Sequence, residues 1–115
     1  MKVSIIIPCI SLNVQAVKCV KKCLELDYPD FEILILPDES NRKSINKKVK
    51  IIPTGKVKPA LKRNIAMGIA TGDFFAFIDD DAYPRKDWLK NAMKYFDNKK
   101  IGLVGGTNLT PPESN

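Results

Sequence analysis

The sequence predicts an α/β fold in which a mostly parallel sheet is flanked by helices. Three observations lead to this prediction: apolar β-branched runs alternate with amphipathic helical stretches, the apolar runs are continuous, and proline or acidic residues end them. Continuous apolar runs are typical of strands buried on both faces, as in parallel sheets. The 115 residues suit one domain, expected to span 1–115 with 110–115 as a tail or linker.

The first third of the chain predicts two strands and the helix between them. Residues 3–7, "VSIII", form a buried strand that Pro8 stops, and residues 31–36, "FEILIL", form a second strand that Pro37 ends. Between them, apolar residues recur at helical spacing among lysines and glutamate. The expected inner stripe of this helix is Val14, Val17, Val20 and Leu24.

The middle of the chain predicts a short third strand and a second long helix. The polar residues 38–48 suggest a short helix, and residues 49–53 a strand. Pro59 suits the first position of a helix, and Gly72 sits where a C-cap glycine belongs. The expected apolar stripe of that helix is Leu61, Ile65 and Ile69.

The last third predicts a strand, a helix and a final strand. Residues 74–78 are apolar and form the fourth strand, and Pro84 can begin the following helix. The expected inner face of that helix is Leu89, Ala92, Met93 and Phe96, with Trp88 at its edge. Residues 101–106, "IGLVGG", complete the sheet.

The basic residues are unevenly distributed. Residues 40–72 hold nine Lys or Arg and no Asp or Glu. The charge of this stretch exceeds the formal net charge of +6 for the whole chain, so the remaining residues are net acidic. Such a stretch favours phosphate groups as partners, although a solvated lysine-rich face is the plain alternative. Nucleic acid is not expected, because no aromatic residue in this stretch can stack on a base.

The cysteines and the hydropathy suggest a cytoplasmic location. Cys9, Cys19 and Cys23 are an odd set, and the chain has no histidine to complete a zinc site or a Cys-His pair. We expect them to be buried and reduced, as in a cytosolic chain. No apolar run reaches membrane-spanning length, so a chain that does not cross the membrane is expected, with docking on the membrane surface left open.

Polar residues follow three of the predicted strands. Ligands of parallel α/β sheets usually bind beyond the carboxyl ends of the strands, where this chain has Pro8-Cys9, Asp38 and residues 79–81. Asp38 can accept a hydrogen bond from a base N–H or a ribose hydroxyl; the alternative is an N-cap for the next segment. Lys62 and Arg63 lie in the first turns of their helix, where anions are favoured, or are simply exposed side chains.

Three consecutive aspartates follow the fourth strand. On an extended backbone Asp79 and Asp81 project to one side, while Asp80 points elsewhere. Carboxylates this close repel each other, and a hard divalent ion is their natural counter-charge. Mg²⁺ or Mn²⁺ is commonly held by one or two carboxylates together with water and phosphate oxygens. The alternative is a capped turn, with Asp81 capping the helix expected at Pro84.

Taken in order, these segments resemble the family 2 glycosyltransferases. The resemblance rests on "VSIIIPC", "FEILILPDES", "GKVKPALKRNIAMGIATGDFFAFIDDDAYP", "WL" and "IGLVGG", which cover nearly the whole chain. It implies the GT-A fold, of which this chain would be the Rossmann-like nucleotide-binding half. It also implies a nucleotide-diphosphate sugar donor and an inverting, metal-dependent transfer to an acceptor hydroxyl, with Mn²⁺ or Mg²⁺ as cofactor.

The resemblance also implies roles for particular residues. Asp38 matches the carboxylate that contacts the nucleobase, and Arg63 the basic residue of the Arg-Asn element near the nucleotide. Asp81 is the expected metal ligand, with Asp79 as the second. The remaining nucleotide-binding residues by this match are Pro8, Cys9, Asp79 and Asp80.

The chain departs from the family in three places. Pro37 stands where many members have a second Asp, and residues 10–13, "ISLN", replace a Tyr-Asn element, which leaves the nucleobase open. In the family, the general base and the acceptor-binding loops follow the strand that resembles residues 101–106. The catalytic base is therefore expected beyond residue 115, and the isolated chain is expected to transfer little or no sugar. The acceptor, a saccharide, lipid or protein, stays open.

Two other readings compete with the transferase. A non-catalytic nucleotide- or phosphate-binding module would not need the second half. A haloacid dehalogenase-like phosphatase also places D-x-D after an apolar strand, but near its N-terminus and usually with Thr or Val later in the motif. Here Tyr83 follows Ala82, and two βα units come first.

Overall fold

The computed structural model describes residues 1–94. Phe96, the strand expected at 101–106 and the tail at 110–115 lie outside these residues. The elements follow one another along the chain as β1 (Val3–Pro8), α1 (Val14–Leu24), β2 (Phe31–Leu36), β3 (Val49–Ile51), α2 (Pro59–Ile69), β4 (Phe74–Phe77) and α3 (Trp88–Met93).

The four strands form one parallel sheet, as predicted. Their order is β3-β2-β1-β4, so β1 lies inside the sheet between β2 and β4. The register pairs Pro8 with Leu36 at the carboxyl ends of β1 and β2, and Ile6 with Phe77 at the end of β4. These ends therefore reach the same edge of the sheet.

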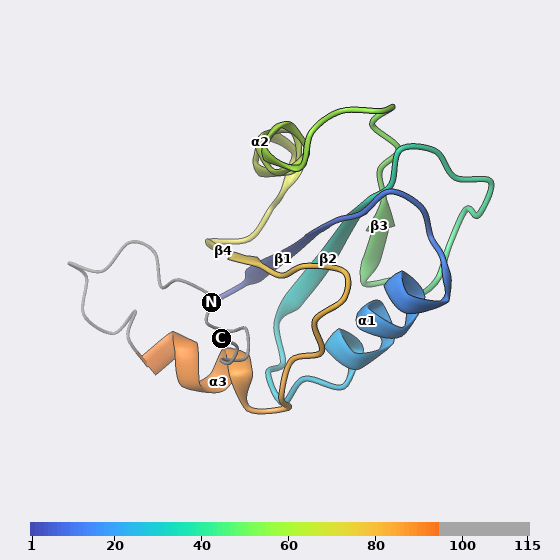
Figure 1. The fold of residues 1–115 in the computed structure, drawn as a ribbon. Coiled ribbons are helices and arrows are strands. Elements are labelled where there is room, and N and C mark those ends of the chain that lie inside the picture. Colours follow the sequence, from blue (N-terminus) through green and yellow to red (C-terminus); the bar gives the residue numbers. More distant parts are fainter. Residues whose placement is uncertain (95–115) are drawn as a thin grey trace.

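Helices cover both faces of the sheet (Figure 1). On one face, α2 packs against Ile6, Leu34 and Leu36 through Ala66. On the other face, α1 and α3 cover the alternate residues of the same strands in the larger core. The members of that core from the strands are Val3, Ile5, Ile7, Phe31, Ile33, Ile35 and Val49. Both faces of β1 and β2 are covered, which is why their sequences are continuously apolar.

Helix α1 has the predicted position, and its inner face shares Val20 and the partly buried Leu24 with the expected stripe. Its buried residues are Ala16, Cys19, Val20 and Cys23, whereas Val14 is 84% exposed. The small alanine and cysteine side chains let the helix lie close to the sheet. Asn13 caps this helix by accepting a hydrogen bond from the Ala16 amide at 2.8 Å. The cysteines are free and buried, as predicted.

Helix α2 begins at Pro59, as predicted, but is rotated relative to the expected stripe. Its buried residues are Lys62 and Ala66, while Leu61 is 47% and Ile69 43% exposed. A lysine faces the sheet because three oxygen atoms there accept its hydrogen bonds, as described below. The exposed-lysine alternative is therefore wrong for Lys62.

Several other expectations are also wrong. No helix forms in residues 38–48, so Asp38 is not an N-cap, and α3 begins at Trp88, four residues after Pro84. Gly72 is not the C-cap of α2, because the cap is Ala70. The short third strand ends at Ile51, before the expected residue 53.

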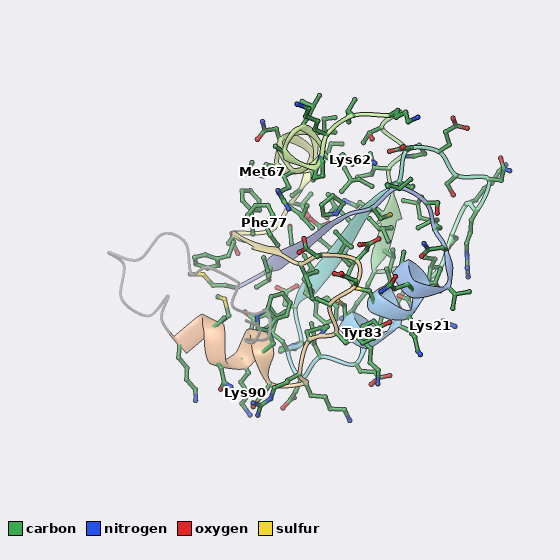
Figure 2. The ribbon with its side chains drawn as sticks, in the orientation of Figure 1. Lys21, Lys62, Met67, Phe77, Tyr83 and Lys90 are labelled. Atoms are coloured by element: carbon green, nitrogen blue, oxygen red, sulfur yellow. The ribbon has the colours of Figure 1, made fainter. Side chains whose placement is uncertain are left out.

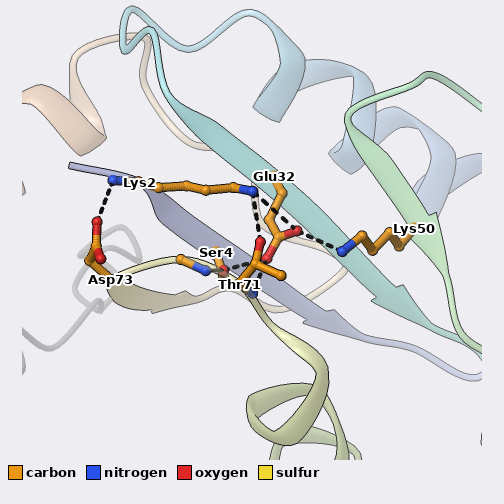
Figure 3. Close-up of polar contacts among 7 residues, drawn as sticks. Lys2, Ser4, Glu32, Lys50, Thr71 and Asp73 are labelled. Carbon is orange, nitrogen blue, oxygen red and sulfur yellow. Dashed lines mark hydrogen bonds and ion pairs between the residues drawn. The ribbon is translucent and has the colours of Figure 1, made fainter.

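A polar network closes the amino end of the sheet (Figure 3). Glu32, only 4% exposed, accepts hydrogen bonds from Ser4 Oγ at 2.6 Å and from the Thr71 amide at 2.7 Å. Lys50 lies 3.0 Å from its other carboxylate oxygen. Burial raises the pKa of Glu32, but these hydrogen bonds and Lys50 outweigh it and lower that pKa to about 2. The network ties β2, β1 and the segment before β4 together.

Candidate functional site

The carboxyl ends of β1 and β2 lie beside each other and are joined by main-chain hydrogen bonds. The Cys9 amide donates to Leu36 O at 3.2 Å, and the Asp38 amide donates to Ile10 O at 2.9 Å. On the other side, the Gly55 amide donates to Asp38 O at 2.8 Å. Gly55 has a φ of +79°, a conformation that glycine adopts without strain. The backbone of Asp38 is thus fixed from both neighbouring segments.

Lys62 connects α2 to these strand ends (Figure 2). Its side chain is nearly buried and points from the helix toward the sheet. The ammonium donates to Cys9 O at 2.6 Å, Leu36 O at 3.0 Å and Asp38 Oδ1 at 2.6 Å. An ammonium has three donors, so each of its hydrogens has a partner. The sequence suggested an anion-binding or an exposed side chain for Lys62, and nothing local to α2 indicates these three protein acceptors.

Arg63, the next residue of α2, reaches the acidic cluster. Its Nη2 lies 3.6 Å from Asp79 Oδ1, and both side chains are partly exposed. An exposed pair of this kind contributes little to stability. The position of this ion pair matters for the site, because the pair places a guanidinium beside the first of three consecutive carboxylates.

The three aspartates form a turn and not an extension of β4. The strand ends at Phe77, and the Ala82 amide donates to Asp79 O at 3.0 Å, which closes a turn over residues 79–82. The expectation that Asp79 and Asp81 share one side of an extended strand is therefore wrong. Asp79 and Asp81 are exposed, whereas Asp80 is partly buried. Asp81 also does not cap a helix at Pro84, since none begins there.

The Asp80 carboxylate affects the ionisation of the Cys9 thiol. Burial and the neighbouring Asp81 carboxylate raise the pKa of Asp80. Burial and the Asp80 carboxylate raise the pKa of Cys9 to about 12. The Cys9 thiol is thus protonated at neutral pH and is no nucleophile.

The structure thus brings the predicted residues to one edge of the sheet. Pro8 ends β1, and Cys9, Asp38 and Lys62 meet beside it. Arg63 and the turn at 79–82 adjoin them, with Cys19 Sγ 3.6 Å from Asp79 O. No group of three or more metal-ligating side chains converges within residues 1–94. The acidic turn therefore offers single carboxylates, a donor set that suits an ion completed by water and phosphate oxygens.

Solved glycosyltransferases share this fold. A structure of Staphylococcus aureus TarS in complex with UDP-GlcNAc superposes with a TM-score of 0.69 and 29% identity, over 84% of this chain and 31% of that chain. The mannosyltransferase PcManGT from Pyrobaculum calidifontis, in complex with GDP-Man and Mn²⁺, gives a TM-score of 0.74 over 86% of this chain and 33% of that chain. At 22% identity, this second likeness concerns the fold alone.

The chain belongs to glycosyl transferase family 2, since the sequence pattern of that family matches residues 4–114. The poly(ribitol-phosphate) beta-N-acetylglucosaminyltransferase TarS of S. aureus is 29% identical over 109 residues, 84% of this chain and 19% of that protein. A dolichyl N-acetyl-alpha-D-glucosaminyl phosphate 3-beta-D-2,3-diacetamido-2,3-dideoxy-beta-D-glucuronosyltransferase of Methanococcus voltae is 30% identical over 90% of this chain and 38% of that protein. This chain thus spans about a fifth to two fifths of these relatives. The resemblance noted in the sequence is confirmed at the level of family and fold.

Proposed function

We propose that this chain binds the nucleotide-diphosphate sugar donor of a metal-dependent, inverting family 2 glycosyltransferase. One observation carries the proposal: a fixed carboxylate, Asp38, lies at the same sheet edge as the acidic turn 79–82 and the guanidinium of Arg63. Such a donor requires a hydrogen-bond acceptor for its base, a positively charged side chain for its phosphates, and carboxylates for the metal ion. The UDP-GlcNAc complex of TarS and the GDP-Man and Mn²⁺ complex of PcManGT support this reading.

Each group has a place in the proposed complex. Asp38 accepts a hydrogen bond from the nucleobase, and the backbone at Pro8 and Cys9 lies beside the nucleotide. Asp79 and Asp80 lie on the ribose and diphosphate side, next to Arg63. Asp81, with Asp79, would hold Mn²⁺ or Mg²⁺. When bound, the ion offsets negative charge on the departing nucleoside diphosphate.

The residues of the acidic turn fit such an ion. Asp79 and Asp81 are exposed, so they can bind a cation without first losing buried partners. Burial, together with the neighbouring carboxylates of Asp81 and Asp79, raises the pKa of Asp80, so the three carboxylates repel one another. An added cation would relieve this repulsion.

In this proposal the general base and the acceptor-binding loops lie outside the donor site described above. We place the base beyond residue 115, so the chain alone is expected to transfer little or no sugar. The donor site would face the cytoplasm, where the buried thiols stay reduced. Within residues 1–94, no helix is long and apolar enough to cross a membrane.

Calorimetric titration tests the proposal. UDP, GDP and inorganic phosphate are titrated into the chain with Mn²⁺, with Mg²⁺ and with EDTA. Metal-dependent binding of a nucleoside diphosphate is the expected result. Equal affinity in EDTA would instead indicate a metal-independent binding module, and the absence of any nucleotide binding would overturn the proposal.

A further inference from the structure

The ion pair between Lys62 and Asp38 leaves one carboxylate oxygen of Asp38 for a ligand. Lys62 donates to Asp38 Oδ1 at 2.6 Å, and its two other hydrogens go to main-chain carbonyls. Within residues 1–94 no group bonds Asp38 Oδ2. The main chain of Asp38 is held by Ile10 O and the Gly55 amide, and Lys62 holds the side chain at Oδ1.

Nucleobases differ in how many donors they present to a carboxylate. Guanine has two adjacent donors, N1–H and the N2 amino group, which pair with both oxygens of a carboxylate. Uracil has one imide N–H between two carbonyl groups and needs one oxygen. Cytosine has an acceptor at the same ring position. A donor left without a partner on binding costs affinity, so the number of free oxygens selects the base.

We propose that Lys62 is a positioning residue that makes this site selective for a uracil nucleotide. Lys62 already donates to Oδ1 at 2.6 Å, and a second donor at that oxygen would lie beside the ammonium charge, so Oδ2 is the favoured acceptor, which matches the imide N–H of uracil. Guanine would pair one donor with Oδ2 and bring the other against the ammonium. Cytosine would place an acceptor against a carboxylate. Residue 37 is proline, so no second carboxylate precedes Asp38 to pair the extra donor of guanine.

The role of Lys62 explains why a lysine is buried at this position. A buried ammonium is costly unless every hydrogen is paired, and here each hydrogen has an acceptor. The three acceptors come from the segment after β1, the end of β2 and Asp38. Lys62 therefore fixes the spacing between the two strand ends as well as the orientation of the carboxylate.

This inference rests on the proposed function and is tested by competition among UDP, CDP and GDP, with Mn²⁺ present. The unmodified chain is expected to bind UDP roughly tenfold or more tightly than CDP or GDP. If no nucleoside diphosphate binds, the proposed function itself fails. If GDP or CDP binds as tightly as UDP, the proposed function stands and the uracil inference is overturned.

Two variants separate base reading from a structural role. In Asp38→Asn, Lys62 still bonds the amide oxygen, so the amide nitrogen takes the outer position and donates. The preference is expected to move from UDP toward CDP, whose ring nitrogen accepts. In Lys62→Met, Oδ1 is released, and the ratio of UDP to GDP affinity is expected to fall several-fold.

The control for Lys62→Met is Lys58→Met, the same change at an exposed lysine beside the start of the same helix. It is expected to leave the UDP to GDP ratio unchanged. Circular dichroism reports whether each variant folds. If Lys62→Met does not fold, the unmodified chain and Asp38→Asn still test the inference. Unaltered base preference in a folded Asp38→Asn variant would overturn the inference.

Discussion

Gly72 lies directly against Ser4, and the contact leaves no space for a side chain. The Gly72 amide donates to Ser4 Oγ at 2.8 Å, and Ser4 Oγ in turn donates to Glu32 at 2.6 Å. A Cβ on Gly72 would lie 2.5 Å from Ser4 Oγ and 2.7 Å from the Ser4 amide nitrogen. Glycine is required here by a close approach of two backbones, since its φ is not positive.

The first prediction follows from this contact. Gly72→Ala is expected to lower the free energy of unfolding by about 1–3 kcal/mol, because backbone atoms of β1 must shift. Gly68→Ala is the matched control, since a Cβ there meets nothing within 4 Å and the residue is helical. That change is expected to stabilise by up to about 1 kcal/mol. Urea unfolding measures both, and equal effects of the two variants would contradict the steric explanation.

The second prediction concerns acid. The pKa of Glu32 is lowered from 4.5 to about 2, so its ionised form is favoured by folding. A carboxylate of this kind stabilises fully above its unfolded pKa, and the stabilisation is lost as pH falls through its folded pKa. Glu32→Gln is expected to cost on the order of 3 kcal/mol at pH 7 and little near pH 2.

Unfolding of both proteins in urea from pH 7 to pH 2 measures the difference. The gap between them should close mainly from about pH 4.5 down to about pH 2. A constant gap over that range would mean that Glu32 contributes through shape and not charge. Glu25→Gln is the control, because Glu25 is exposed.

The third prediction concerns the thiols. Cys9, Cys19 and Cys23 are buried, and burial with the nearby Asp80 raises the pKa of Cys9 to about 12. The hydrogen bond with Cys19 and burial raise the pKa of Cys23. A thiol reagent at pH 7.5 is therefore expected to label the native chain slowly and the urea-unfolded chain at all three cysteines. Rapid labelling of the native chain would show that the β1 end opens readily.

The fourth prediction tests the acidic turn. Asp81→Ala is expected to weaken Mn²⁺-supported binding of UDP by roughly tenfold or more, and to leave binding in EDTA unaltered. Asp30→Ala is the control, because Asp30 is also exposed but precedes β2, at the opposite end of the strands. Unchanged affinity in Asp81→Ala would remove this residue from the metal site.

The strands could be predicted from the sequence because burial on both faces leaves a simple signal. Residues 31–36 are apolar apart from Glu32, and the structure has β2 at these residues. Periodicity succeeded in α3, where Leu89 is buried and Met93 packs against the core as predicted. It misplaced residues of α1 and α2, since it assumes that the most apolar stripe faces inward. In α2 the three acceptors for Lys62 come from distant segments, and no local pattern shows them.

The site was predictable in its residues but less so in its geometry. Strand-end position and family resemblance identify Asp38, Arg63 and the aspartates. The turn at 79–82 was only the alternative interpretation of the aspartates, because three like residues after a strand give no sign of where the extended backbone stops. The link from Lys62 to Asp38 depends on the rotation of α2 about its axis, a tertiary property.

Strand β2 has a buried anchor, Glu32, near its start, and its other end leads to Asp38, the proposed base-contacting residue. Glu32 and Asp38 are six residues apart, about 20 Å along an extended chain. Substitutions that far apart usually contribute independently. The architecture is therefore suited to diversification. Directed evolution can alter the proposed base preference at Asp38 and Lys62 while Glu32, Ser4 and Gly72 preserve the fold. Stabilising changes near Glu32 could offset the loss of stability that such substitutions cause.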